Sequence, residues 1–151
     1  MKTLTSATAL LAALVSMTGC SDAGKPYVPA RGQVLVGGKP AEGVLVTLVP
    51  TSGDDDPGAR PAGTVAADGS FSVASYDAAA RKSHPGAPPG EYKVVLTWFP
   101  PAGLGTLDPN VAQVDKLGGR YRDPARSQFR VVVKETPTEF EPIRLNDAAK
   151  P

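Results

Sequence analysis

Short apolar runs, separated everywhere by glycine and proline, constrain this chain more than any other feature. Gly and Pro contribute 16 residues each to a chain of 151. The strongest strand signal, 91–99, places Tyr92, Val94, Leu96 and Trp98 on one face, which is the period of a strand. Breakers at this density interrupt helices and favour short strands joined by turns. The pattern therefore predicts an all-β fold.

Seven segments carry strand signals, and together they predict a seven-stranded antiparallel β-sandwich over residues 31–145. The expected strands are 33–36, 44–49, 63–66, 70–74, 91–99, 128–134 and 138–145. Pro142 cannot donate to a ladder, so the last strand is expected at an edge or with a bulge. Residues 75–89 and 100–126 are expected to be loops, the second with one helical turn near 110–116.

The N-terminus has the features of an export signal. Lys2 precedes an apolar stretch, 7–15, that is shorter than the roughly 20 residues needed to span a bilayer. The sequence Met17-Thr18-Gly19-Cys20 ends this stretch and resembles the bacterial lipobox, in which the cysteine is acylated. The resemblance implies lipidation of Cys20. An ordinary signal peptide that leaves Cys20 as a free thiol, or an uncleaved anchor, are the alternatives.

These features predict the organisation of the whole chain. Residues 1–19 are expected to be a lipoprotein signal peptide, 20–30 a lipidated tether, 31–145 the β-sandwich domain and 146–151 a tail. Acyl chains on Cys20 would hold the exported protein to a membrane of the bacterial cell envelope. Ser21, rather than an aspartate, follows the cysteine, and by analogy with lipoprotein sorting this favours the outer membrane.

The composition argues against several functional classes. A net charge of +1 provides no field for nucleic acid. With one Cys and one His, the chain lacks a multi-histidine or cysteine-cluster metal site, and no cofactor is expected.

His84 has no evident catalytic partner and is expected to be a solvated loop residue. The acidic run 54–56 is expected in a solvated loop, with a weak Ca²⁺ site as the alternative. Asp68 is expected to form a turn with the glycine that follows it.

Two groups of residues are candidates for ligand binding. Arg120, Arg122 and Arg126, with Arg130 further along, form a basic cluster around Tyr121 that is suited to phosphate or an acidic polysaccharide. The alternative is a structural rim, in which Tyr121 and Ser127 hold the long loop against the sandwich. A second candidate is Trp98, whose ring could stack on a sugar; because it shares a face with core positions, burial in the core is the alternative.

Three segments together resemble carboxypeptidase regulatory-like domains. They are Gly32 to Pro50, with its Gly-Lys-Pro turn, Ala67 to Val73, with Asp-Gly before Phe71, and Pro89 to Val95, with Pro-Gly-Glu-Tyr. The segment 121–127 further resembles short bacterial lipoproteins that carry a single such domain. The resemblance implies a transthyretin-like (prealbumin-like) sandwich, grouped with carbohydrate-binding-like folds. It implies little about activity.

The expected function is therefore that of a non-enzymatic, lipid-anchored protein of the cell envelope whose sandwich acts as a binding or assembly module. Two alternatives stay open. One is a carbohydrate-binding domain for surface polysaccharide, and the other is an accessory subunit of a larger exported enzyme. The expected partners are the membrane, through acylated Cys20, and either an envelope polysaccharide or another envelope protein.

Overall fold

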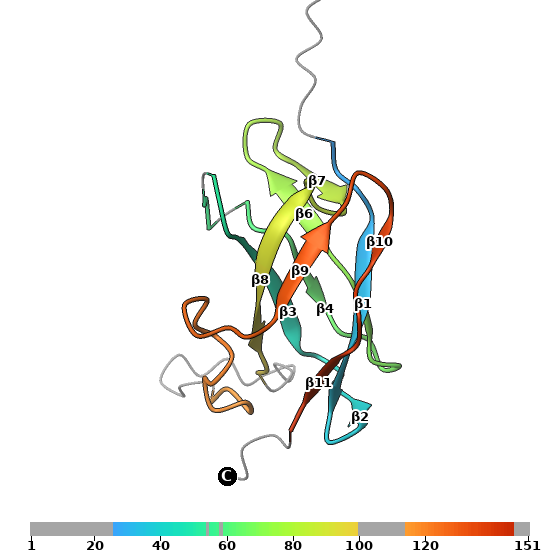
Figure 1. Ribbon diagram of the computed structural model, residues 1–151, viewed down its shortest axis with the longest axis vertical. Helices are drawn as coiled ribbons and strands as arrows, with labels where there is room; N and C mark the ends of the chain where they lie inside the picture. Colours follow the sequence, from blue (N-terminus) through green and yellow to red (C-terminus); the bar gives the residue numbers. More distant parts are fainter. Residues whose placement is uncertain (1–25, 54, 58, 100–113, 147–151) are drawn as a thin grey trace, which may run out of the picture.

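Two β-sheets enclose one hydrophobic core in the computed structural model, which describes residues 26–53, 55–57, 59–99 and 114–146 (Figure 1). These residues form eleven strands and no helix. The all-β prediction is confirmed. The number of strands exceeds the seven expected, because several strands are only two to four residues long and left no recognisable pattern in the sequence.

The smaller sheet is organised around β1 (Ala30–Val36). β2 (Lys39–Pro40) and β5 (Ser70–Ser72) pair with it in antiparallel orientation. β10 (Thr138–Glu139) and β11 (Ile143–Leu145) instead run parallel to it. The final strand was predicted to be antiparallel, and this is wrong for β10 and β11. The remaining strand pairs of the two sheets are antiparallel.

The predicted strand 138–145 is interrupted between β10 and β11. The partner of Ala30 is Thr138 and the partner of Val34 is Ile143, so this segment contains one residue more than β1 over the same length. The extra residue makes a bulge, and Pro142, which has no N–H, lies within it. The bulge expected from this proline is thus present.

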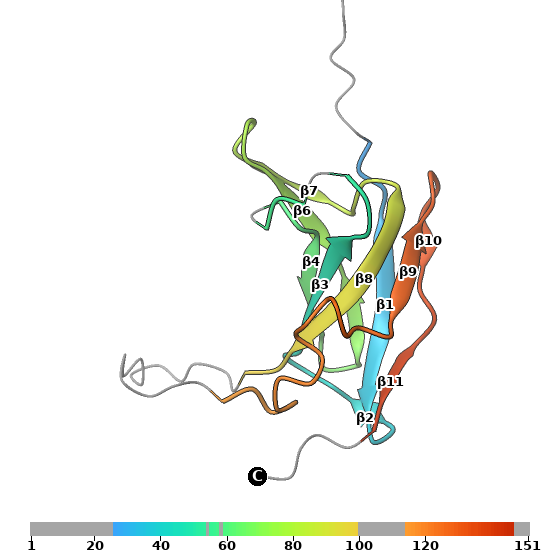
Figure 2. The same cartoon turned by 60° about the vertical axis from the view of Figure 1, so that its left-hand side comes forward.

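The larger sheet has the order β7-β6-β4-β3-β8-β9, and every neighbouring pair is antiparallel (Figure 2). Its centre is the pair β3–β8, in register from Leu45 opposite Thr97 to Pro50 opposite Tyr92. The strands are β3 (Leu45–Pro50), β4 (Ala62–Thr64), β6 (Ala74–Asp77), β7 (Lys82–Pro85), β8 (Gly90–Thr97) and β9 (Arg130–Val133).

The hairpin of β6 and β7 lies where a loop was predicted, so the loop over 75–89 is wrong. Its side chains are mostly small or polar, and this hid the alternation of exposed Ala74, buried Ser75 and exposed Tyr76. The buried hydroxyl of Ser75 is satisfied because it donates to the carbonyl of Gly86 at 2.8 Å. Pro88 and Pro89 follow the hairpin and do not interrupt it.

The core joins the inner faces of both sheets with side chains from the segments that connect the strands. Val34 comes from the smaller sheet, Leu48 and Leu96 come from the larger sheet, and all three are fully buried. Leu117, from the segment after β8, is buried equally deeply. Removing such side chains from water is the main source of stability in a domain of this size.

Candidate functional site

The segment 114–129, which carries most of the predicted binding residues, is hydrogen-bonded along β8. The backbone N–H of Leu96 donates to the carbonyl of Tyr121 at 2.9 Å, and the N–H of Val94 donates to Phe129 at 2.9 Å. The hydroxyl of Ser127 donates to the carbonyl of Val94. These are the contacts expected of a structural rim held by Tyr121 and Ser127. A ligand role for the segment stays a prediction.

Asp115 organises the first turn of this segment. Its carboxylate accepts three backbone N–H groups, from Trp98 and Leu117 at 2.9 Å each and from Gly119 at 3.1 Å. The turn thereby inserts Leu117 into the core. A helical turn was predicted near 110–116; residues 110–113 lie outside the described residues, and Val114 and Asp115 are not helical.

Trp98 lies just beyond the end of β8, half-buried against the core. The ammonium nitrogen of Lys116 sits 4.9 Å from the centre of the indole ring, within the range of a cation–π contact. This position combines features of the two alternatives for Trp98, burial in the core and stacking on a sugar. One part of the ring packs on the core while the rest reaches the surface.

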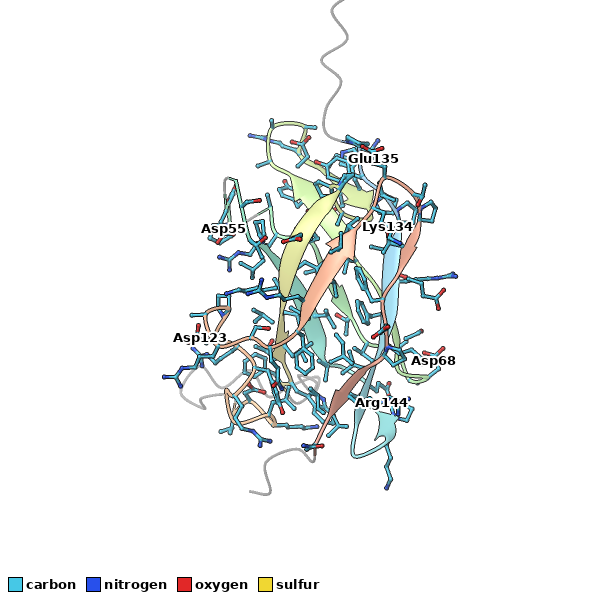
Figure 3. The ribbon with its side chains drawn as sticks, in the orientation of Figure 1. Asp55, Asp68, Asp123, Lys134, Glu135 and Arg144 are labelled. Atoms are coloured by element: carbon cyan, nitrogen blue, oxygen red, sulfur yellow. The ribbon has the colours of Figure 1, made fainter. Side chains whose placement is uncertain are left out.

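Two of the predicted arginines, Arg120 and Arg126, contact different neighbours. The Nε of Arg120 donates to the carbonyl of Leu117 at 3.2 Å, and its guanidinium lies 5.6 Å from the centre of the Tyr121 ring. Arg126 pairs with Asp123 at 3.6 Å, in the loop where Figure 3 labels the aspartate. Arg122 is exposed, and Arg130 is on β9. The structure thus brings Arg120 and Tyr121 together, while Arg126 is occupied by its own acidic neighbour.

At the opposite end of the molecule, a cleft of about 350 Å³ is lined by three tyrosines and several prolines. Tyr76 projects from β6 and is 45% exposed. Tyr92 forms part of the wall and is nearly buried, and its hydroxyl donates to the carbonyl of Pro88 at 2.7 Å. Burial raises the pKa of Tyr92, so this phenol stays protonated as a donor. We call this site the tether-end cleft.

Tyr27 completes the cleft and comes from the segment predicted as tether. Its ring stacks on His84, with centroids 4.3 Å apart and planes 2° from parallel. Val28 and Ala87 exchange two backbone hydrogen bonds of 2.9 Å. The packed fold therefore begins before residue 31. His84 is a half-buried residue of β7, so its prediction as a solvated loop residue is wrong.

Gly86 makes this docking possible. It has a φ of 101°, and a Cβ built there would lie 2.1 Å from the carbonyl oxygen of Val28. Any other residue would meet both a strained backbone and a direct clash. The tight passage of the N-terminal segment across the hairpin therefore depends on this glycine.

The polar side of the cleft contains Arg60, Asp56 and Glu91. Arg60 makes a two-pronged ion pair with Asp55, at 2.7 Å and 2.6 Å. This hydrogen bonding holds the pKa of Asp55 below its usual range and raises the pKa of Arg60. The guanidinium is thereby fixed at the rim of a cleft that tyrosine and proline side chains also line.

The Ca²⁺ site, the alternative for the acidic run 54–56, gains no support from Asp55. Its carboxylate forms an ion pair with the guanidinium of Arg60. Asp54 lies outside the described residues. Within the part of the chain that the structure describes, no group of three or more His, Cys, Asp or Glu side chains is placed to hold a metal ion. Asp68 accepts the N–H and the hydroxyl of Ser70, at 2.9 and 2.6 Å, which is the turn role expected of it. These bonds lower its pKa.

Cys20 and the signal segment fall in 1–25, outside the described residues. Among the residues that are described, no helix is long and apolar enough to cross a membrane.

Comparison with known proteins adds no relative: no family model, curated protein or solved structure matches this chain.

Sequence reasoning missed the tether-end cleft. The sequence predicts Tyr76 in a loop and Tyr27 in a flexible tether, and it marks neither as a binding residue. The small and polar side chains of this hairpin gave no hydrophobic alternation from which it could be predicted. Nothing in the sequence indicated that Tyr27 stacks on His84, because 56 residues lie between them in the chain.

Proposed function

We propose that this chain is a non-enzymatic binding module of the bacterial cell envelope, exported and held to a membrane by an acylated Cys20. The lipobox-like sequence ending at Cys20 supports the anchor. The two-sheet fold is compatible with the transthyretin-like sandwich implied by the resemblance to carboxypeptidase regulatory-like domains, although that finer assignment is part of the proposal.

The observation that carries the binding proposal is the position of Tyr27, which leads from the anchor and also lines the tether-end cleft. From Cys20 to Tyr27 the chain spans at most about 25 Å even when fully extended. The stack on His84 and the pairing of Val28 fix where the tether leaves the domain. The cleft would therefore face the anchoring membrane, and segment 114–129 lies at the other end of the molecule (Figure 1).

The residues that line the cleft favour envelope polysaccharide as its ligand. A carbohydrate-binding domain is therefore the second candidate function. Tyrosine rings such as Tyr76 provide faces for sugar rings, and Arg60 and Glu91 provide a donor and an acceptor at the edge. Sugar sites combine an apolar floor with a few polar groups in this way.

Membrane anchoring is tested with Cys20→Ser in the full chain, expressed in a bacterial host. We expect the unmodified chain in the membrane fraction, and the variant either in the soluble fraction or with its signal uncleaved. A variant that is processed normally and still sediments with membranes would contradict the anchor.

Binding at the tether-end cleft is tested by co-sedimentation of the full chain, in detergent, with the polysaccharide fraction of the native envelope. We expect saturable binding that Tyr76→Ser weakens about ten-fold, the usual loss for one ring-stacking contact. Phe99→Ser is the matched control, because Phe99 is 40% exposed at the other end. Equal losses in both variants, or no binding by the folded parent, would remove the polysaccharide proposal.

A further inference from the structure

β9 ends the larger sheet with an edge that no strand of the described residues covers. The N–H of Val94 donates to Phe129, and in the same ladder Tyr92 faces Val131. In an antiparallel ladder, bonded pairs alternate. The N–H and C=O groups of Arg130 and Val132 therefore point away from β8, toward the open side.

Two other sheet edges carry prolines, whereas β9 has none and has only the charged residues Arg130 and Lys134 at the ends of its valine run. Proline and charged residues at edges prevent strand addition. β7 combines Lys82 with Pro85, and the segment of β10 and β11 is flanked or broken by Pro137 and Pro142. β9, in contrast, has three consecutive valines, 131–133, and Val132 is 51% exposed.

A groove of about 480 Å³ lies beside this edge, between β9 and the returning segment of β10 and β11. Its lining includes Phe129 and Val131 on one side and Phe140 and Ile143 on the other. Figures 1 and 2 both show β9 next to β10 at this side of the molecule. A strand added to β9 would thus place every second side chain toward this groove, where the apolar residues stand beside Thr138, Glu139 and Glu141.

The charges on β9 indicate what kind of strand would fit. Arg130 and Lys134 are exposed at the two ends of the valine run, and Lys134 is labelled at the top of β9 in Figure 3. Acidic residues opposite these two would be favoured, whereas like charges directly opposite destabilise a strand pair. If two copies paired over the whole of β9, Arg130 of one would face Lys134 of the other. The charges therefore disfavour a second copy.

We propose that β9 is a docking edge for an extended segment of a partner protein. This segment adds to the larger sheet, alternates apolar residues toward the groove, and carries acidic residues at the two outward positions that meet Arg130 and Lys134. β-strand addition of this kind obtains its affinity from main-chain hydrogen bonds and its specificity from alternate side chains. The docking edge shares no lining residue with the tether-end cleft and does not depend on the function proposed for it.

The test uses the full chain in detergent and a fluorescein-labelled peptide, Ser-Gly-Glu-Val-Val-Val-Glu-Gly-Ser, followed by fluorescence anisotropy. We expect saturable binding, about ten-fold tighter than that of the same peptide with both Glu replaced by Lys. Replacing the central Val of the peptide by Pro should remove binding, since the N–H that pairs with β9 is lost.

Val132→Pro removes one outward N–H of β9 and leaves the ladder with β8 intact, so it should weaken peptide binding at least ten-fold. Val132→Thr, which keeps the N–H, is the matched control and should bind within about three-fold of the parent. The double variant Arg130→Glu with Lys134→Glu should prefer the Lys-flanked peptide. Tyr76→Ser should not change peptide binding, which separates this result from any failure at the cleft.

Three results would overturn the proposal. One is an absence of saturable binding by the folded parent. Another is equal binding by Val132→Pro and Val132→Thr, with both variants shown to be folded by circular dichroism. The third is a dimer in analytical ultracentrifugation that Val132→Pro dissociates, because the occupant of the edge would then be a second copy of the chain.

Discussion

The two ends of the molecule use similar residue types for different purposes. At the end formed by segment 114–129, the carboxylate of Asp115 and the backbone carbonyl of Tyr121 fasten this segment to β8 and to Trp98, and Arg120 donates to a carbonyl within the segment. At the tether end, Tyr27 and Tyr76 line a cleft, and Arg60 is fixed at its rim. The comparison teaches that a cluster of arginines and aromatic rings in a sequence does not by itself indicate a binding site. What matters is whether the backbone nearby already uses those groups.

The largest effect should come from Leu117→Ala. Leu117 is fully buried and is the deepest contact between segment 114–129 and the core. Truncating a buried leucine leaves a cavity, and we expect a loss of about 3 kcal/mol in the free energy of unfolding, measured by urea denaturation. If the loss were below about 1 kcal/mol, the segment would not be a structural rim and its arginines would regain interest as ligand contacts.

Asp115→Ala should cause the next largest loss of stability. The substitution leaves the N–H groups of Trp98, Leu117 and Gly119 without their acceptor, and we expect a loss of about 2 kcal/mol in stability. Asp123→Ala is the matched control in the same segment, because its carboxylate accepts one exposed N–H, from Ala125. Its loss should stay below about 1 kcal/mol. Similar losses for both would show that Asp115 has no special place in the turn.

Tyr92→Phe probes the wall of the tether-end cleft. It removes the hydrogen bond to the carbonyl of Pro88 and keeps the ring, so we expect a loss of about 1 kcal/mol in thermal or urea unfolding. The comparison between the two ends is sharpened if this variant also loses affinity for polysaccharide while Asp115→Ala does not. Loss of binding in Asp115→Ala alone would reverse the assignment of the two ends.

The smallest effect should be the acid sensitivity of the Asp55–Arg60 pair. The pKa of Asp55 is lowered in the folded protein, so the pair stabilises the fold above the ordinary carboxyl pKa, and this contribution is lost as the pH falls through the folded value. Both side chains are partly exposed, which limits the gain to less than about 1 kcal/mol. Asp55→Asn should accordingly destabilise the protein at pH 7 and have no effect near pH 2. A loss that persisted at the lower pH would point to packing rather than charge.

Much of the fold could be predicted wherever the apolar alternation was strong. β3 and β8 were expected within one or two residues of their observed bounds, and the turn at Asp68 was identified from its dipeptide. The hairpin of β6 and β7 was missed because its side chains are small and polar, so hydrophobic periodicity carries no information there. The direction of β10 and β11 was missed because strand orientation depends on partners distant in sequence.

The candidate sites divide in the same way. The sequence singled out Trp98, Arg120, Tyr121, Arg122 and Arg126. It could not show that three of them have neighbours as partners: Trp98 contacts the ammonium of Lys116, Arg120 donates to the carbonyl of Leu117, and Arg126 pairs with Asp123. The tether-end cleft and the docking edge on β9 each require segments that are far apart in the chain. Their residues gave no local signal of binding.

By itself, the sequence determined an all-β chain with short strands, because glycine and proline limit the length of every regular element, and it placed a lipobox-like cysteine before the domain. Only the tertiary structure decided that Tyr27 packs on His84, that β10 and β11 lie parallel to β1, and that β9 is left with an open edge. The reason is physical. Local propensity acts over a few residues, whereas pairing and burial join residues that meet only after the sheets have closed around the core.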